Sequence, residues 1–152
     1  MKIIVPQEIT SKIHNAVMES SPNEIKGALF AERLFDECFQ IDDVYISQKC
    51  GTHIFSNLVN NVTYKRFEKR YFKKHKYDYL NHNYIGDWHS HPLFECVPSN
   101  YDKKEIKDEL AKSNALFLIQ LIVKDENGKL TGRCYFCNKN SELAECELII
   151  HY

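Results

Sequence analysis

The sequence predicts an α/β (α+β) fold, a mixed sheet flanked by helices, in a single domain that spans residues 1–152. Three observations predict it. Segments with apolar residues at helical spacing take turns along the chain with shorter segments whose apolar residues suit strands. The pair Asn127-Gly128 between two apolar segments is a strong hairpin signal, so part of the sheet is antiparallel. A chain of 152 residues that is 43% apolar and lacks a linker suits one hydrophobic core.

The first third of the chain predicts a strand, a helix and a hairpin. A short strand at 2–5 precedes a helix at 7–20, in which Ile9, Ile13 and Val17 form an apolar stripe that Ser20-Ser-Pro22 ends. Two strands then follow at 25–34 and 38–46, joined through the polar pair Asp36-Glu37. Residues 47–60 are predicted to form an irregular segment.

A long helix is predicted at 61–79, with Tyr64, Phe67 and Tyr71 on one side. Seven Lys or Arg residues lie between Lys65 and Lys76. They form either a basic face for a partner or nucleic acid, or the solvated side of an amphipathic helix. The second interpretation is favoured, because the aromatic residues suit a core and the whole chain carries a formal charge of −1.

The second half of the chain predicts further strands around one more helix. The helix begins at Ser99 and reaches about Asn114. The run from Ala115 to Val123 is apolar without alternation, as in a strand buried on both faces. The other strands are expected at 83–88, 130–137 and 146–151.

Composition excludes several classes of protein. No apolar run approaches the roughly 20 residues of a membrane span, and the start of the chain lacks the apolar core of a signal peptide, so a cytoplasmic protein with no membrane partner is expected. The near-zero net charge argues against a general affinity for nucleic acid. The six cysteines are expected to be reduced, and Cys134 and Cys137, three apart on a strand, to face opposite sides.

The stretch that carries chemistry is His89-Ser-His91-Pro92, followed by Ser99 and Asp102. Histidines two apart on a strand face the same side, with Cβ atoms roughly 7 Å apart, so their rings can converge on one metal. Asp102 falls in the first turn of the next helix, from which its carboxylate can complete the set. Three N and O ligands leave a tetrahedral ion one open position, as in catalytic zinc sites.

Each part of this pattern also has an ordinary explanation. Ser99-Asn-Tyr-Asp102 alone is a helix-capping sequence, and the histidines alone suit half-exposed strand positions. The combination at these spacings favours a metal site. Metal-assisted hydrolysis also needs a base, for which Glu24 is a candidate, although local sequence does not separate it from Glu19 or Glu32.

Taken together, Glu24-x-x-Gly27, His89-x-His91-Pro92, Ser99 and Asp102 resemble the JAMM metalloprotease motif of the MPN domain family. Every signature position is filled, so the chain resembles the catalytic branch, and the order of elements agrees over nearly the whole chain. Gly86-Asp-Trp88 before the first histidine is similar to the bacterial stand-alone, prokaryotic JAB-like members. The resemblance implies the MPN/JAMM-like fold, which is cytidine-deaminase-like.

The resemblance also implies roles and partners. His89, His91 and Asp102 would bind one zinc ion (Zn2+) per chain, Glu24 would act as general acid and base, and Ser99 would donate a hydrogen bond to the oxyanion. The implied substrate is the bond after the C-terminal tail of a ubiquitin-like protein, in a precursor or a conjugate. Bacterial members often accompany cognate activating and conjugating enzymes, in sets that resemble antiviral defence systems.

Other functions stay open at this point. They are a peptidase that processes a sulfur-carrier protein, a nucleic-acid-associated repair module, a scaffold with a relic site, and an iron site for redox chemistry. An extended tail is expected to bind beside a sheet edge by strand addition, between walls formed by 47–60 and 93–98. Cys96 lies in the second wall, where a thiolate in the open zinc position is a less favoured alternative to a plain loop cysteine.

Overall fold

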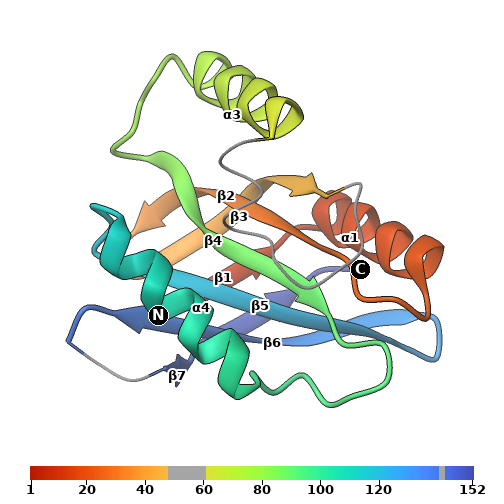
Figure 1. The fold of residues 1–152 in the computed structure, drawn as a ribbon. Coiled ribbons are helices and arrows are strands. Elements are labelled where there is room, and N and C mark those ends of the chain that lie inside the picture. The colour runs from red at the N-terminus through yellow and green to blue at the C-terminus, as the bar shows by residue number, and fades with distance from the viewer. Residues whose placement is uncertain (48–60, 141–142) are drawn as a thin grey trace.

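The computed structural model describes residues 1–47, 61–140 and 143–152, which form a curved sheet with helices on both faces (Figure 1). In chain order the elements are β1 (Lys2–Val5), α1 (Gln7–Ser20), β2 (Lys26–Phe35), β3 (Cys38–Ile46), α3 (Val62–Lys74), β4 (His82–Ser90), α4 (Asn100–Lys112), β5 (Phe117–Glu126), β6 (Lys129–Asn138), β7 (Ala144–Glu145) and β8 (Glu147–Ile150). The predicted α+β class is confirmed.

The described strands form one mixed sheet in the order β7-β6-β5-β4-β2-β3-β1-β8. Strand β1 runs parallel to β3 and β8, and β4 runs parallel to β5. The remaining neighbours are antiparallel. Strand β4 therefore lies inside the sheet, with β2 on one side and β5 on the other.

The two outermost strands of this order are consecutive in the chain, because only Cys146 separates β7 from β8. The backbone N–H of Cys146 donates to the carbonyl of Cys134 on β6 (2.7 Å), and that of Glu147 donates to the carbonyl of Met1 beside β1 (3.1 Å). One short segment thus connects both edges and curls the sheet toward closure. The predicted last strand at 146–151 is present as β8, but the sequence did not predict β7, which ends where the segment changes partner at Cys146.

The helices divide between the two faces of the sheet (Figure 1). The apolar stripe of α1, with Ile9, Ile13 and Val17, packs into the largest core cluster together with Leu29 and Trp88. Helices α3 and α4 cover the opposite face, α3 over β2 and β3 and α4 over β5 and β6. Because alternate residues of a strand face opposite sides, β2 supplies Leu29 to one core and Phe30 to the other.

Helix α3 is the solvated amphipathic helix that its spacing predicts. The aromatic rings of Tyr64 and Tyr71 are buried against Phe30, while all seven basic side chains between 65 and 76 are exposed. The helix ends at Lys74, five residues earlier than predicted. The reason is that Lys76 and Tyr77 adopt left-handed backbone angles (φ 54° and 60°), which turn the chain back toward β4.

The bounds of β5 and α4 also differ from the predicted ones. Strand β5 begins later than predicted, at Phe117, and continues to Glu126, because its pairing with β6 runs up to the Asn127-Gly128 turn. Ser99 is the N-cap of α4 and not its first residue. Residues 48–60 lie outside the described part of the chain, so the predicted wall at 47–60 is not placed.

The described cysteines are free thiols, and Cys134 and Cys137 pack in different core clusters on opposite faces of the sheet, as predicted. Among the described helices, none is long and apolar enough to cross a membrane.

Close approach of three strands explains Gly27, the glycine of the Glu24-x-x-Gly27 pattern. The indole N–H of Trp88 on β4 donates to the carbonyl of Tyr45 on β3 (3.1 Å) across Gly27. A Cβ on Gly27 would lie 1.7 Å from that carbonyl oxygen and 2.6 Å from the indole nitrogen. Both distances are far below van der Waals contact, and one obstacle is backbone, so no larger residue fits without moving a strand.

We therefore expect Gly27→Ala to lower the free energy of unfolding by about 3 kcal/mol, the upper part of the usual range for overpacking. Urea denaturation followed by circular dichroism measures it. Gly128→Asn is the matched control, because a Cβ at Gly128 meets nothing within 4 Å and Asn tolerates its left-handed backbone. Equal stabilities for the two variants would contradict the packing argument.

Candidate metal centre

The end of β4 presents the two histidines of the motif. His89 pairs with Lys26 of β2 and Ile122 of β5, so its backbone is held from both sides. The backbone N–H of His91 donates to the carbonyl of Val123 (2.8 Å). This bond continues the pairing between β4 and β5 by one residue beyond the end of β4. Both side chains are buried.

Ser90, between the two histidines, joins β4 to the start of β2. Its hydroxyl accepts a hydrogen bond from the backbone N–H of Ile25 (2.9 Å), and its own N–H donates to the Ile25 carbonyl (2.8 Å). These bonds lock the start of β2 to the end of β4. The Ser90 side chain therefore faces away from the two histidines, as expected for the residue between them on a strand.

His89, His91 and Asp102 converge on one point, and their donor atoms lie within 4.8 Å of one another. The two Nε2 atoms are 3.1 Å apart. Asp102 Oδ1 lies 3.7 Å from His89 Nε2, and Oδ2 lies 3.9 Å from His91 Nε2. Ligand atoms at about 2.0–2.1 Å from a tetrahedral zinc ion would be about 3.4 Å apart, so these residues fit such an ion.

The protonation states also suit metal binding. His91 Nδ1 lies 2.9 Å from the carbonyl oxygen of Glu95, and since a carbonyl only accepts, Nδ1 carries the proton and Nε2 offers its lone pair. Burial, ahead of other causes, lowers the pKa of His89 to about 3, so its imidazole is neutral. The neutral ring of His89 and the Nε2 atom of His91 can therefore both serve as metal ligands.

Asp102 is held as a carboxylate by the start of its own helix. Ser99 donates to Asp102 Oδ2 through its backbone N–H (2.7 Å) and its hydroxyl (2.6 Å), and the N–H of Asp102 donates back to Ser99 Oγ (3.1 Å). Burial opposes ionisation, but His89 and these hydrogen bonds outweigh it and lower the pKa of Asp102. The capping box predicted as the ordinary explanation exists, and it orients the candidate ligand.

Glu24 lies at the same end of the sheet. It immediately precedes Ile25, whose backbone is bonded to Ser90 between the histidines, and it is half-buried. Glu32 is excluded as an alternative base, because it pairs with His82, seven residues and about 23 Å along β4 from His89. Glu19 is exposed near the C-terminal end of α1.

Cys96 is not one of the described residues whose donor atoms gather at this point. It is buried beside Ile122 and Tyr135, and the Tyr135 hydroxyl donates to its backbone carbonyl (3.0 Å). Burial raises the pKa of its thiol, which disfavours the thiolate. These observations favour a packing role for Cys96.

Asp87 and Glu109 form an acidic pair near the histidines that the sequence did not predict. Tyr84 Oη lies 2.6 Å from Glu109 of α4 and 3.0 Å from Asp87, two residues before His89 on β4. One hydroxyl carries one proton, so both contacts are hydrogen bonds only if one carboxyl is itself protonated. Burial, followed by the charge of Asp87, raises the pKa of Glu109 to about 10. Nothing local in the sequence links Glu109 to Asp87.

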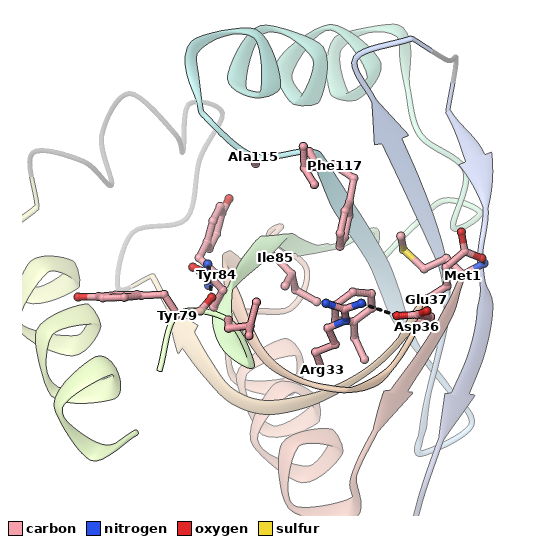
Figure 2. Close-up of a pocket in the computed structure, with 13 residues that line it drawn as sticks. Met1, Arg33, Asp36, Glu37, Tyr79, Tyr84, Ile85, Ala115 and Phe117 are labelled. Carbon is pink, nitrogen blue, oxygen red and sulfur yellow. Dashed lines mark hydrogen bonds and ion pairs between the residues drawn. The ribbon is translucent and has the colours of Figure 1, made fainter. Parts of the chain in front are cut away.

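A cavity of about 750 Å³ lies elsewhere, between the end of β2 and the starts of β4 and β5. Figure 2 shows Phe117 and Ile85 facing the ion pair of Arg33 and Asp36 in this cavity. It contains none of the motif residues. A smaller cavity of about 570 Å³ is lined by Ile25, next to Glu24, and by Ile46 and Ser47.

Comparison with known proteins agrees with this geometry. The family of prokaryotic homologs of the JAB domain matches residues 6–136. The structure resembles a solution structure of a Desulfitobacterium hafniense protein (19% identity, TM-score 0.68, covering 98% of this chain and 92% of that one). It also resembles a solution structure from Salinibacter ruber (15% identity, TM-score 0.57, 99% and 92%).

A crystal structure of a JAB1/MPN domain protein from Archaeoglobus fulgidus is more distant (18% identity, TM-score 0.49, 98% and 99%). No curated protein matches the sequence. At these identities the two solution structures support the fold, and the family match together with the His-His-Asp group supports a metal-dependent hydrolase.

Ser99→Ala removes the side-chain cap of α4 and one of the two hydrogen bonds that orient Asp102. We expect it to lower the free energy of unfolding by about 1 kcal/mol and to weaken zinc binding about 10-fold to 100-fold. Calorimetric titration with zinc measures the second effect. Ser113→Ala, at the other end of the same helix, should leave zinc affinity unchanged. Equal zinc affinities for the two variants would show that Ser99 does not act on the ligand.

Glu109 also makes stability depend on pH. Its pKa in the folded protein lies above the ordinary value of about 4.3, so above that pH the folded state holds a proton that the unfolded state releases. Stability from this group is therefore lost as pH rises toward about 10, by at most about 1.4 kcal/mol per pH unit. We expect urea denaturation between pH 5 and 9 to show a flatter profile for Glu109→Gln. Parallel profiles for the two proteins would contradict the assignment.

Proposed function

This chain belongs to the family of prokaryotic homologs of the JAB domain, and we propose that it is a zinc-dependent isopeptidase or peptidase that cleaves after the C-terminus of a ubiquitin-like protein. One observation carries the proposal. His89, His91 and Asp102 come from the end of β4 and the start of α4 and hold three donor atoms close together, and His91 and Asp102 are each oriented by a partner outside the group. Because the family includes non-catalytic members, the complete ligand set is what favours an enzyme.

In the proposed mechanism His89, His91 and Asp102 hold the ion. Zinc bound there supplies Lewis-acid chemistry, lowering the pKa of a coordinated water to about 7 and polarising a carbonyl oxygen. The buried histidines provide neutral nitrogen ligands, and Asp102 provides the single negative charge. Three protein ligands would leave the fourth position of a tetrahedral ion for water or substrate.

Glu24 is proposed as the general base and acid. Its carboxylate takes a proton from the attacking water and delivers it to the amine that leaves, so no proton is gained or lost over the cycle. The Ile25–Ser90 hydrogen bonds support this role, because they tie the residue next to Glu24 to the ligand strand. Rigid positioning of this kind is what general acid–base catalysis requires.

Ser99 is proposed to donate its hydroxyl to the oxyanion of the tetrahedral intermediate. That proton is directed at Asp102 Oδ2 in the structure, so the hydroxyl must turn during the reaction. After the turn Asp102 keeps one of its two hydrogen bonds from Ser99, because the backbone N–H of Ser99 donates to the same oxygen. The backbone N–H of Ser99 thus positions Asp102, and its hydroxyl is available to the substrate.

The loop beside the metal group suits a protein tail. Leu93, Phe94, Val97 and Tyr101 are large apolar residues that are 45–75% exposed next to His91 and Asp102. Exposed apolar clusters of this kind mark interaction surfaces. The tail does not add to β4 itself, because β2 and β5 already pair with both of its edges. Strand addition would therefore use backbone outside β4, such as the wall at 93–98.

The same chemistry serves a sulfur-carrier protein, whose exposed tail would enter the same site, so this remains the second candidate. Cognate activating and conjugating enzymes, and a place in an antiviral defence set, are proposed only by analogy with bacterial JAMM proteins. A repair module that binds nucleic acid is disfavoured, because the exposed basic side chains of α3 are balanced by acids elsewhere in a chain of net charge −1.

The test combines metal analysis with cleavage of a ubiquitin-like protein that carries a C-terminal extension. We expect about one zinc ion at this site, and expect Glu24→Gln to retain it while losing activity about 100-fold to 10,000-fold, the usual contribution of a general base. Glu19→Gln is the matched control and should keep full activity. Unreduced cleavage by Glu24→Gln would refute the role of Glu24, and absence of zinc from the unaltered protein would refute the metalloprotease itself.

A further inference from the structure

A second group of metal-ligating side chains lies at the other end of β4. It consists of Asp42 of β3, His75 at the C-terminus of α3, and His82, the first residue of β4. The seven residues from His82 to His89 separate the two groups by about 23 Å along the strand. None of the three belongs to the motif, and the proposed function does not use them.

The donor atoms of this group lie close together. His82 Nδ1 is 3.0 Å from Asp42 Oδ2, and His75 Nε2 is 3.5 Å from the same oxygen. These distances bracket the spacing of about 3.4 Å between ligands of a tetrahedral ion. The two imidazole rings stack with centroids 3.8 Å apart and planes at 29°, so binding of one ion by both would require the rings to tilt away from this stack.

Two contacts suggest a built site and not a chance cluster. The Tyr71 hydroxyl donates to Asp42 Oδ1 (2.8 Å), which fixes the carboxylate and leaves Oδ2 for an ion. His75 Nε2 is buried and makes no hydrogen bond to any residue that the structure describes, although it faces that oxygen. A buried nitrogen without a partner is costly, and an ion bound to its lone pair would remove the cost.

The surroundings favour a cation. His75 is the C-cap of α3, where the helix dipole is negative. The ion would face Asp42 directly, with Asp43 and Glu32 nearby and Lys74 as the opposing charge. The three side chains are 14–17% exposed, so an ion can enter and a water molecule can complete its coordination.

We propose that Asp42, His75 and His82 form a second zinc site, which fastens the C-terminal end of α3 to β3 and β4. Two nitrogen ligands and one carboxylate match the preferences of zinc. The three residues come from three elements, so an ion bound among them would stabilise the packing of α3. This inference does not depend on the proposed peptidase activity.

The test is zinc titration of the chelator-treated full chain, followed by metal analysis after dialysis. We expect about two zinc ions per chain, and about one in the double variant His89→Ala, His91→Ala. In that double variant, adding His75→Ala should abolish the remaining binding, and Tyr71→Phe should weaken it about 10-fold to 100-fold. Zinc should also raise the melting temperature of the double variant.

His14→Ala is the matched control in the same background. His14 Nε2 also pairs with an aspartate, Asp125, at 2.7 Å, but among the described residues no second histidine joins this pair, so zinc binding should persist. Circular dichroism checks that each variant is folded. A double variant that is folded and binds no zinc overturns the proposal, even if His75→Ala proves unstable. Failure of the peptidase site instead shows as equal zinc content in the double variant and the unaltered chain.

Discussion

The position of β4 between β2 and β5 is the constraint on which the rest of the structure depends. Its pairing sets Trp88 opposite Gly27, His89 opposite Lys26, and Ser90 against Ile25. The first contact needs a residue without a side chain, because the indole of Trp88 reaches the carbonyl of Tyr45 across it. A slip of one residue would turn His89 to the face that α1 covers and carry Glu24 away from the metal group. Fold stability and site geometry therefore rest on the same hydrogen bonds.

Two acids of helix α4 are held in opposite protonation states. Asp102 receives two hydrogen bonds from Ser99, which favour its ionised form beside the histidines. Glu109, seven residues further along the helix, lies against the Tyr84 hydroxyl and Asp87, and burial raises its pKa to about 10. The environment, and not the residue type, thus confines negative charge to the carboxylate that faces the histidines.

Sequence patterns predicted the features that depend on local spacing. The His89-x-His91 pair, the capping box at Ser99 and the Asn127-Gly128 hairpin each follow from a few adjacent residues. The patterns did not predict the split at Cys146, because the change of partner from β6 to β1 depends on how far the sheet curls. They also missed the acidic pair and the group at Asp42, whose members are joined only by tertiary packing.

The two His-His-Asp groups use opposite ends of helices. Asp102 lies in the first turn of α4, where free N–H groups and the positive end of the dipole stabilise a carboxylate. His75 lies at the last turn of α3, where the negative end favours a cation or a ligand to one. Each group joins a helix end to a different end of β4, so each can also brace the layer of helices against the sheet. Because exposed apolar residues follow His91 directly in the chain, whereas Tyr71 fixes the carboxylate of the second group, we expect substrate chemistry at the first group and a structural role for the second.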